Sequence, residues 1–199
     1  MNGTRITGDD TSRVSMCIGL GVAVLVTGVV LYFVFVGHAI SKETTGFDTN
    51  RPVPSDATLR SRLKPDQYHV TRENGTETAF QNEYWNNVRP GIYVDVITSE
   101  PLFCSVDKFD GGTGRPTFSK PISKDLIVEK DDNSHDMHRI ELRAKRSDAH
   151  LGHLIADPTS PSGQRYAVNS AALHFVPTED LQHQGYAAYS ALVTQVAAK

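Results

Sequence analysis

Residues 147–175 read SDAHLGHLIADPTSPSGQRYAVNSAALHF and contain the two segments that decide the fold. In the second of these, residues 165–169, polar and apolar side chains alternate with a period of two, which is typical of a half-buried β-strand. The alternation places Arg165, Ala167 and Asn169 on the same face. The strand is therefore predicted to present a cation, a methyl group and an amide side by side.

The first segment, residues 150–153 (HLGH), carries two histidines three residues apart. Both imidazoles can converge on one pocket if Gly152 lets the chain turn sharply or approach another strand closely. We therefore expect a site on a pair of strands, with His150, His153, Arg165 and Asn169 as its polar groups.

Five segments of the chain resemble the methionine sulfoxide reductase B family. They follow the family order over most of residues 59–186, and they are NGTETAFQNEYW at 74–85, GIYVDVITSEPLF at 91–103, KFDGGTGRPTFSKPI at 108–122, DAHLGH at 148–153 and RYAVNSAALHF at 165–175. The resemblance implies a mainly β fold, in which twisted antiparallel sheets form a small β-sandwich with short flanking helices. It also implies peptide-methionine (R)-S-oxide reductase as the activity of the family.

In that family, a cysteine thiolate attacks the sulfur of the R-sulfoxide, while histidines and an asparagine bind and protonate its oxygen. An arginine helps to keep the thiolate charged, as a neighbouring cation should. Thiols such as those of thioredoxin then reduce the sulfenic acid that remains. Carried over by motif, the polar roles fall on His150, His153, Asn169 and Arg165.

The site departs from the family pattern at its centre. The family's Arg-Tyr-Cys-x-Asn has an alanine here, so Ala167 stands at the position of the nucleophile. The family's Gly-Trp-Pro-Ser-Phe reads GRPTF at 114–118, so Arg115 replaces the indole that packs against the substrate methyl group. Thr113 stands where some relatives place a recycling cysteine. Arg115 and Phe175 are expected to bind substrate, and Arg115 would make the methyl slot tolerant of anions.

Three functions stay open on this basis. The first is a reductase-like domain that binds oxidised methionine or a related ligand without turnover. The second is an active reductase that uses Cys104, the only thiol at 59–199, or another route. The third is an interaction or scaffold domain whose pocket is idle. The first is preferred, because the methyl group of Ala167 cannot form the covalent bond to sulfur.

Neither zinc nor another cofactor is expected. Many family members bind a structural zinc through two Cys-x-x-Cys pairs, and the matching positions here are Asp95, Thr98, Ala144 and Ser147. With no cysteine among them, the ligand set for zinc is missing. The net charge of -3 also disfavours general nucleic-acid binding.

Residues 14–41 contain no Asp, Glu, Lys or Arg, and their apolar run exceeds the roughly 20 residues that span a bilayer. We predict a transmembrane helix there, after a tail at 1–13 and before a linker at 42–58 and a reductase-like domain at 59–199. A cleaved signal peptide is the alternative, although the run is longer than the about 7–15 residues of a signal core. The layout favours a single-pass membrane protein with an extracytoplasmic domain.

Local patterns predict several further elements. A helix should begin near Pro65, because a missing N–H costs nothing in the first helical turn. Residues 91–97 and 102–104 are predicted to form a hairpin, and residues 137–143 a strand.

Three other segments are predicted to be irregular or short. Asn-Gly-Thr at 74–76 should be a turn with Gly75 at positive φ. Residues 125–133 are expected to be a charged connector, and residues 177–189 a helical cap.

Overall fold

The structure, a computed structural model, describes residues 47–134, 137–160 and 162–194. The membrane helix predicted at 14–41 lies outside these residues. Within the part that is described, no helix is both long enough and apolar enough to cross a membrane. The observed elements therefore belong to the predicted domain and to the end of the segment before it.

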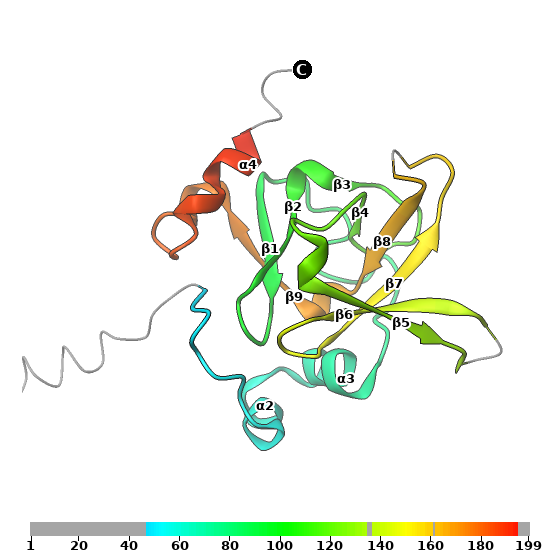
Figure 1. Cartoon of the computed structure of the whole chain (residues 1–199), viewed down its shortest axis with the longest axis horizontal. Coiled ribbons are helices and arrows are strands. Elements are labelled where there is room, and N and C mark those ends of the chain that lie inside the picture. The colour runs from blue at the N-terminus through cyan, green and yellow to red at the C-terminus, as the bar shows by residue number, and fades with distance from the viewer. Residues whose placement is uncertain (1–46, 135–136, 161, 195–199) are drawn as a thin grey trace, which may run out of the picture. The chain divides into compact units, whose positions relative to one another are not determined.

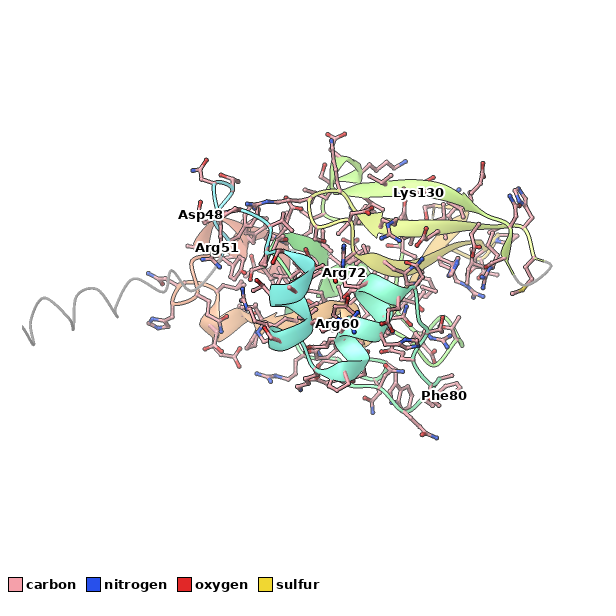
Figure 2. All side chains as sticks on the ribbon, turned by 90° about the horizontal axis from the view of Figure 1, so that it is seen from below. Asp48, Arg51, Arg60, Arg72, Phe80 and Lys130 are labelled. Carbon is pink, nitrogen blue, oxygen red and sulfur yellow. The ribbon has the colours of Figure 1, made fainter. Side chains whose placement is uncertain are left out.

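Two short helices precede the sheets. Helix α2 (Asp56–Arg62) begins after Ser55, whose side chain accepts a hydrogen bond from a backbone N–H of the first turn. Helix α3 (Pro65–Glu73) has Pro65 in its first turn, which confirms the helix start predicted there. The two helices contact each other and lie side by side (Figure 2).

The turn after α3 differs from the prediction. Asn74 adopts the left-handed conformation, with φ 57°, which asparagine tolerates better than most residues. Gly75 is required for another reason, because a Cβ at this position would lie 2.3 Å from the ring of His69. The prediction of positive φ at Gly75 was therefore wrong by one residue.

The first sheet has three antiparallel strands in the order β2–β1–β9 (Figure 1). They are β1 (Gly91–Asp95), β2 (Pro101–Cys104) and β9 (Leu173–Pro177). The predicted hairpin is confirmed, because β1 and β2 are consecutive strands that pair antiparallel.

The second sheet has six antiparallel strands in the order β3–β4–β8–β7–β6–β5. They are β3 (Lys108–Phe109), β4 (Thr117–Phe118), β5 (Ile127–Asp132), β6 (Arg139–Ala144), β7 (His150–Ala156) and β8 (Gln164–Val168). Strand β6 confirms the strand predicted at 137–143. The connector predicted at 125–133 is wrong, because β5 pairs with β6 along its full length. The charged residues of β5 suit its place at the edge of the sheet, where they discourage pairing with another chain.

An aromatic cluster joins the two sheets. Phe103 of β2 stacks on Phe118 of β4 with 4.5 Å between ring centroids, and its centroid lies 6.2 Å from that of Tyr166 of β8. Tyr93 of β1 meets Phe118 edge-on at 5.1 Å. All four side chains are buried. The mainly β, antiparallel architecture with few short helices is therefore confirmed.

Residues between 181 and 193 pack on the first sheet. Leu181 and Tyr186 are buried with apolar residues of β1 in a second cluster. Helix α4 is Ser190–Thr194. Short 3-10 turns occur at Ser105–Asp107, Lys124–Leu126, Ser170–Ala172, Thr178–Asp180 and Ala187–Tyr189. The helical cap expected at 177–189 thus contains two 3-10 turns, and the short α-helix begins only after this range.

Candidate functional site

The HLGH and RYAVN segments lie on neighbouring strands, β7 and β8. His153 is directly opposite Ala167 in this antiparallel pair, and Gly152 is opposite Val168. A Cβ at position 152 would lie 2.1 Å from the carbonyl oxygen of Ala167. Gly152 therefore serves the close approach of the strands, which is one of the two roles expected for it.

A cavity of about 170 Å³ lies beside Ala167. Three other predicted site residues line it, namely Arg115, His153 and Asn169. The remaining lining residues are Thr76, Thr113, Arg139, Gly152, Leu154 and Ile155. The cavity beside the nucleophile position thus combines cationic groups with apolar walls.

His150 lines a second hollow instead, which has a volume of about 480 Å³. His153 lines both spaces, as do Thr76 and Arg139. The rings of His150 and His153 lie 5.5 Å apart, edge to face. The two histidines are therefore brought together, but only His153 lines the cavity beside Ala167.

Arg165 and Phe175 are placed elsewhere. Arg165 donates a hydrogen bond to the carbonyl oxygen of Gly111 at 2.9 Å and lies 3.5 Å from the carboxylate of Asp157. Phe175 packs in the aromatic core, with its ring centroid 4.9 Å from that of Tyr93. Neither side chain lines the cavity beside Ala167.

Cys104 is buried in the apolar cluster on the other sheet, with an exposed fraction of 2%. Its thiol lies 3.8 Å from the carbonyl oxygen of Gly91. Burial raises the pKa of the Cys104 thiol, which reduces the share of reactive thiolate at neutral pH. Cys104 does not line the cavity beside Ala167.

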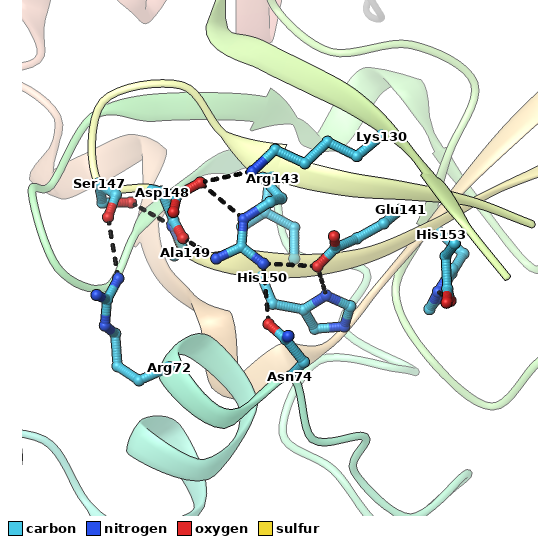
Figure 3. Close-up of polar contacts among 12 residues, drawn as sticks. Arg72, Asn74, Lys130, Glu141, Arg143, Ser147, Asp148, Ala149, His150 and His153 are labelled. Carbon is cyan, nitrogen blue, oxygen red and sulfur yellow. Dashed lines mark hydrogen bonds and ion pairs between the residues drawn. The ribbon is translucent and has the colours of Figure 1, made fainter. Parts of the chain in front are cut away.

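Carboxylates hold both histidines. The Nδ1 atom of His150 lies 2.7 Å from Glu141, and Arg143 donates to the same carboxylate at 2.6 Å (Figure 3). Burial lowers the pKa of His150, against the opposing effect of Glu141. The Nε2 atom of this ring is buried and has no hydrogen-bond partner among the described residues. His150 is thus held as a neutral imidazole with one free nitrogen.

His153 is held by a carboxylate of its own. Its Nε2 atom lies 2.8 Å from Asp132, and Arg139 donates to the same carboxylate oxygen at 2.7 Å. Hydrogen bonds from Ser134 and His153, together with the charge of Arg139, hold the pKa of Asp132 well below its usual range. Strand β5, which the sequence did not predict, therefore supplies the group that orients His153.

Glu77 is a site residue that sequence reasoning missed. Its carboxylate accepts hydrogen bonds from the N–H groups of Ser170 at 2.6 Å and Ala171 at 3.0 Å. Its own N–H donates to Asn169, and its carbonyl oxygen accepts a hydrogen bond from Arg115 at 2.7 Å. Burial raises the pKa of this carboxyl, although these hydrogen bonds oppose the rise. One residue thus positions both Arg115 and Asn169.

The sequence contained a signal for another missed group. Arg139, Glu141 and Arg143 alternate with apolar residues along β6. The strand was predicted, and period-two alternation places all three charged side chains on one face. In the neighbouring strand β7, His153 is opposite Glu141 and His150 is opposite Arg143.

Asp95, one of the four positions compared above with the zinc ligands that the resemblance implies, is a buried carboxylate. Asp95 is fully buried and accepts hydrogen bonds from the Thr98 hydroxyl at 2.6 Å and the Ile97 N–H at 3.1 Å. Burial raises the pKa of Asp95, and hydrogen bonds from Thr98 and Ser147 oppose the rise. In the described ranges, no cluster of three or more His, Cys, Asp or Glu side chains is placed to hold a metal ion.

Comparison with known proteins agrees with this architecture. The family model described as the SelR domain matches residues 63–177. The chain is also 49% identical over 139 residues to a protein of Vibrio cholerae serotype O1 (strain ATCC 39315 / El Tor Inaba N16961) named peptide methionine sulfoxide reductase MsrA/MsrB. That match covers 70% of this chain and 37% of the relative, so the chain spans little more than a third of its length. The chain therefore belongs to the SelR domain family, the family of methionine sulfoxide reductase B.

Proposed function

We propose that this family member is catalytically impaired and binds oxidised methionine, or a related ligand, without reducing it. The observation that carries the proposal is the position of Ala167 in the wall of the cavity. Its strand lies between β4 and β7, with Thr117 opposite on one side and His153 on the other. Covalent reduction needs a nucleophile at the substrate sulfur, and residue 167 offers only a methyl group.

Retained polar groups support binding. His153 and Asn169 line the cavity, and each is fixed by hydrogen bonds to other residues. Fixed donors and acceptors bind ligands at a lower cost in entropy than mobile ones. These groups would therefore serve a sulfoxide oxygen even though the step that consumes the sulfoxide is lost.

The alternative is an active reductase, which would use another route or Cys104. Its burial among apolar residues, its raised pKa and its absence from the cavity lining all oppose this role. Reduction of methionine (R)-sulfoxide with dithiothreitol tests the alternative directly. We expect the full-length chain to be no faster than its Cys104→Ala variant. Turnover that disappears in the variant would establish the enzyme and overturn our proposal.

The scaffold alternative is tested by binding. Titration with a capped, uncharged methionine (R)-sulfoxide, followed by NMR, should shift signals of residues around Ala167. The S-sulfoxide serves as the matched control, because it differs only in configuration at sulfur. If neither sulfoxide shifts any signal in a folded sample, the cavity is idle and the scaffold function is favoured.

We further propose that residues 14–41 anchor the chain in a membrane by a single helix, with the domain on the extracytoplasmic side. The absence of charged residues over this stretch supports the proposal. Full-length protein should stay with the membranes after an alkaline carbonate wash. Release at the size expected for cleavage after residue 39 would indicate a signal peptide instead. No zinc, other cofactor or nucleic-acid partner is part of the proposal.

A further inference from the structure

Two arginines with unused donors line the cavity beside Ala167. They are Arg115, from the loop before β4, and Arg139, from β6. The Nε atom of each is buried and has no hydrogen-bond partner within the described residues. A buried donor that lacks an acceptor is unfavourable, so both groups favour a ligand that brings acceptor atoms into the cavity.

The charges of these arginines are only partly compensated. Arg139 pairs with Asp132 at 2.7 Å, but the same carboxylate oxygen also lies 2.8 Å from His153. Arg115 donates to the neutral backbone carbonyl oxygen of Glu77, and the Glu77 carboxyl group interacts with the charge of Arg115 without a direct hydrogen bond to it. In the described part of the chain, Arg115 forms no ion pair with a carboxylate. Among the described residues, two arginines and no carboxylate line the cavity, and this lining favours an anion.

The shape of the cavity limits the size of that anion. Its volume of about 170 Å³ is close to that of an apolar cavity of about 150 Å³ that accommodates benzene. Besides the charged groups, the lining includes the apolar residues Leu154, Ile155 and Ala167. A small ligand that carries both charged oxygens and a short alkyl group matches this mixed lining.

We propose that the cavity binds an alkyl sulfur oxyanion, a sulfinate or a sulfonate, in preference to an uncharged sulfoxide. Such a group has two or three oxygens for donors that come from the loop before β4 and from strand β6, and its alkyl substituent contacts the apolar lining residues. This inference rests on the proposed function because it concerns the same cavity beside Ala167. The ligand differs, since a sulfinate or a sulfonate is more oxidised than a sulfoxide and carries a negative charge.

The test compares two probes that differ in charge and share a tetrahedral sulfur. Methanesulfonate and dimethyl sulfone are titrated separately into the full-length chain, with binding followed by NMR shifts of residues around the cavity. We expect methanesulfonate to bind at least about tenfold more tightly than dimethyl sulfone. Equal binding of the two probes would overturn the proposal.

Two arginine variants localise the effect. Arg115→Gln should weaken methanesulfonate binding at least about tenfold, because it removes the charge and the Nε donor together. Arg89→Gln is the control, since the Arg89 side chain is 58% exposed and does not line the cavity. Equal loss in both variants, or no loss in Arg115→Gln, would contradict the proposed site.

A second variant tests the site if Arg115→Gln does not fold. Ala167→Leu fills the cavity without any change of charge, and it should abolish methanesulfonate binding. Retained binding would place the anion elsewhere and overturn the inference.

Titration with the capped (R)-sulfoxide separates this inference from the proposed function. Binding of the sulfoxide without methanesulfonate would refute the inference and leave the proposed function intact. Binding of methanesulfonate without the sulfoxide would support the inference and refute sulfoxide recognition. If neither binds, both are refuted.

Discussion

Arg143 offers a quantitative test of how burial determines the contribution of an ion pair to the free energy of unfolding. It is 8% exposed and donates to Glu141 at 2.6 Å, to Asp148 at 2.7 Å and to Asn74 at 2.9 Å (Figure 3). The side chains of Arg143 and Glu141 are 10% and 15% exposed. Removal of one partner from such a pair leaves the other buried and uncompensated, which costs roughly 3–5 kcal/mol.

The chain provides a matched pair at the surface. Arg89 and Glu179 also lie 2.6 Å apart, but their side chains are 58% and 63% exposed. Water screens an exposed pair, so it contributes little. If distance alone mattered, removal of either arginine would cost the same stability. If burial matters, removal of Arg143 should cost much more than removal of Arg89.

The assay is thermal unfolding followed by circular dichroism. With about 2–4 °C per kcal/mol for a domain of this size, Arg143→Ala should lower Tm by roughly 6–20 °C. Arg89→Ala should lower Tm by about 8 °C at most, including the loss of its contact with the ring of Phe175.

A second substitution tests the cause. In the Arg143→Ala background, Glu141→Gln should recover part of the lost stability, because it removes the uncompensated buried carboxylate. Equal Tm shifts for Arg143→Ala and Arg89→Ala would refute the reasoning. A further decrease on addition of Glu141→Gln would also refute it.

Three other predictions concern the site and the fold. Ala167→Cys should restore some reduction of methionine (R)-sulfoxide with dithiothreitol. Addition of Arg115→Trp, which rebuilds an apolar slot for the substrate methyl group, should raise kcat/KM about tenfold, which corresponds to roughly 1.4 kcal/mol of transition-state stabilisation. A folded double variant without a single turnover would show that the polar groups are misplaced. Because the pKa of His150 is lowered in the folded state, the unfolded chain binds its proton more readily, and stability should fall as the pH drops below about 6.5. Denaturant titrations between pH 8 and 5 should show a shallower decline in His150→Gln, and an unchanged slope would contradict the assignment. Asp95→Ala should lower the free energy of unfolding by roughly 2–4 kcal/mol, because it leaves buried donors unpaired, while EDTA should leave the Tm of the parent chain unchanged; a large effect of EDTA would reveal a metal.

Alternation along the chain predicted the strands that form the site, because each buries one face. The same pattern did not reveal β5, since its charged residues Glu129, Lys130 and Asp131 lie exposed at a sheet edge and do not alternate with apolar ones. That omission hid Asp132, which holds His153. Strand β6, the partner of β5, follows directly along the chain, but exposed charged side chains at a sheet edge leave no apolar alternation that would mark the strand.

The contacts of long side chains were harder to predict than the face of a strand on which each residue lies. Arg165 is on the same strand as Ala167, but its long side chain extends to Gly111 and Asp157. Glu77 was inside a quoted motif, yet its role depends on backbone N–H groups more than ninety residues away along the chain. Periodicity specifies where a Cβ points, and contacts made by long side chains depend on the tertiary fold.

Strand β8 separates what the domain needs for folding from what it needs for chemistry. Tyr166 and Val168 are 3% and 0% exposed, and Tyr166 packs near Phe103 in the core. Ala167, which lies between these two residues in the strand, lines the cavity and contributes only a methyl group. Selection for a stable domain therefore acts on the neighbours of residue 167 and hardly on residue 167 itself. A lineage could lose the catalytic sulfur in this way without a penalty in folding, and the empty position would then be free to evolve toward another ligand.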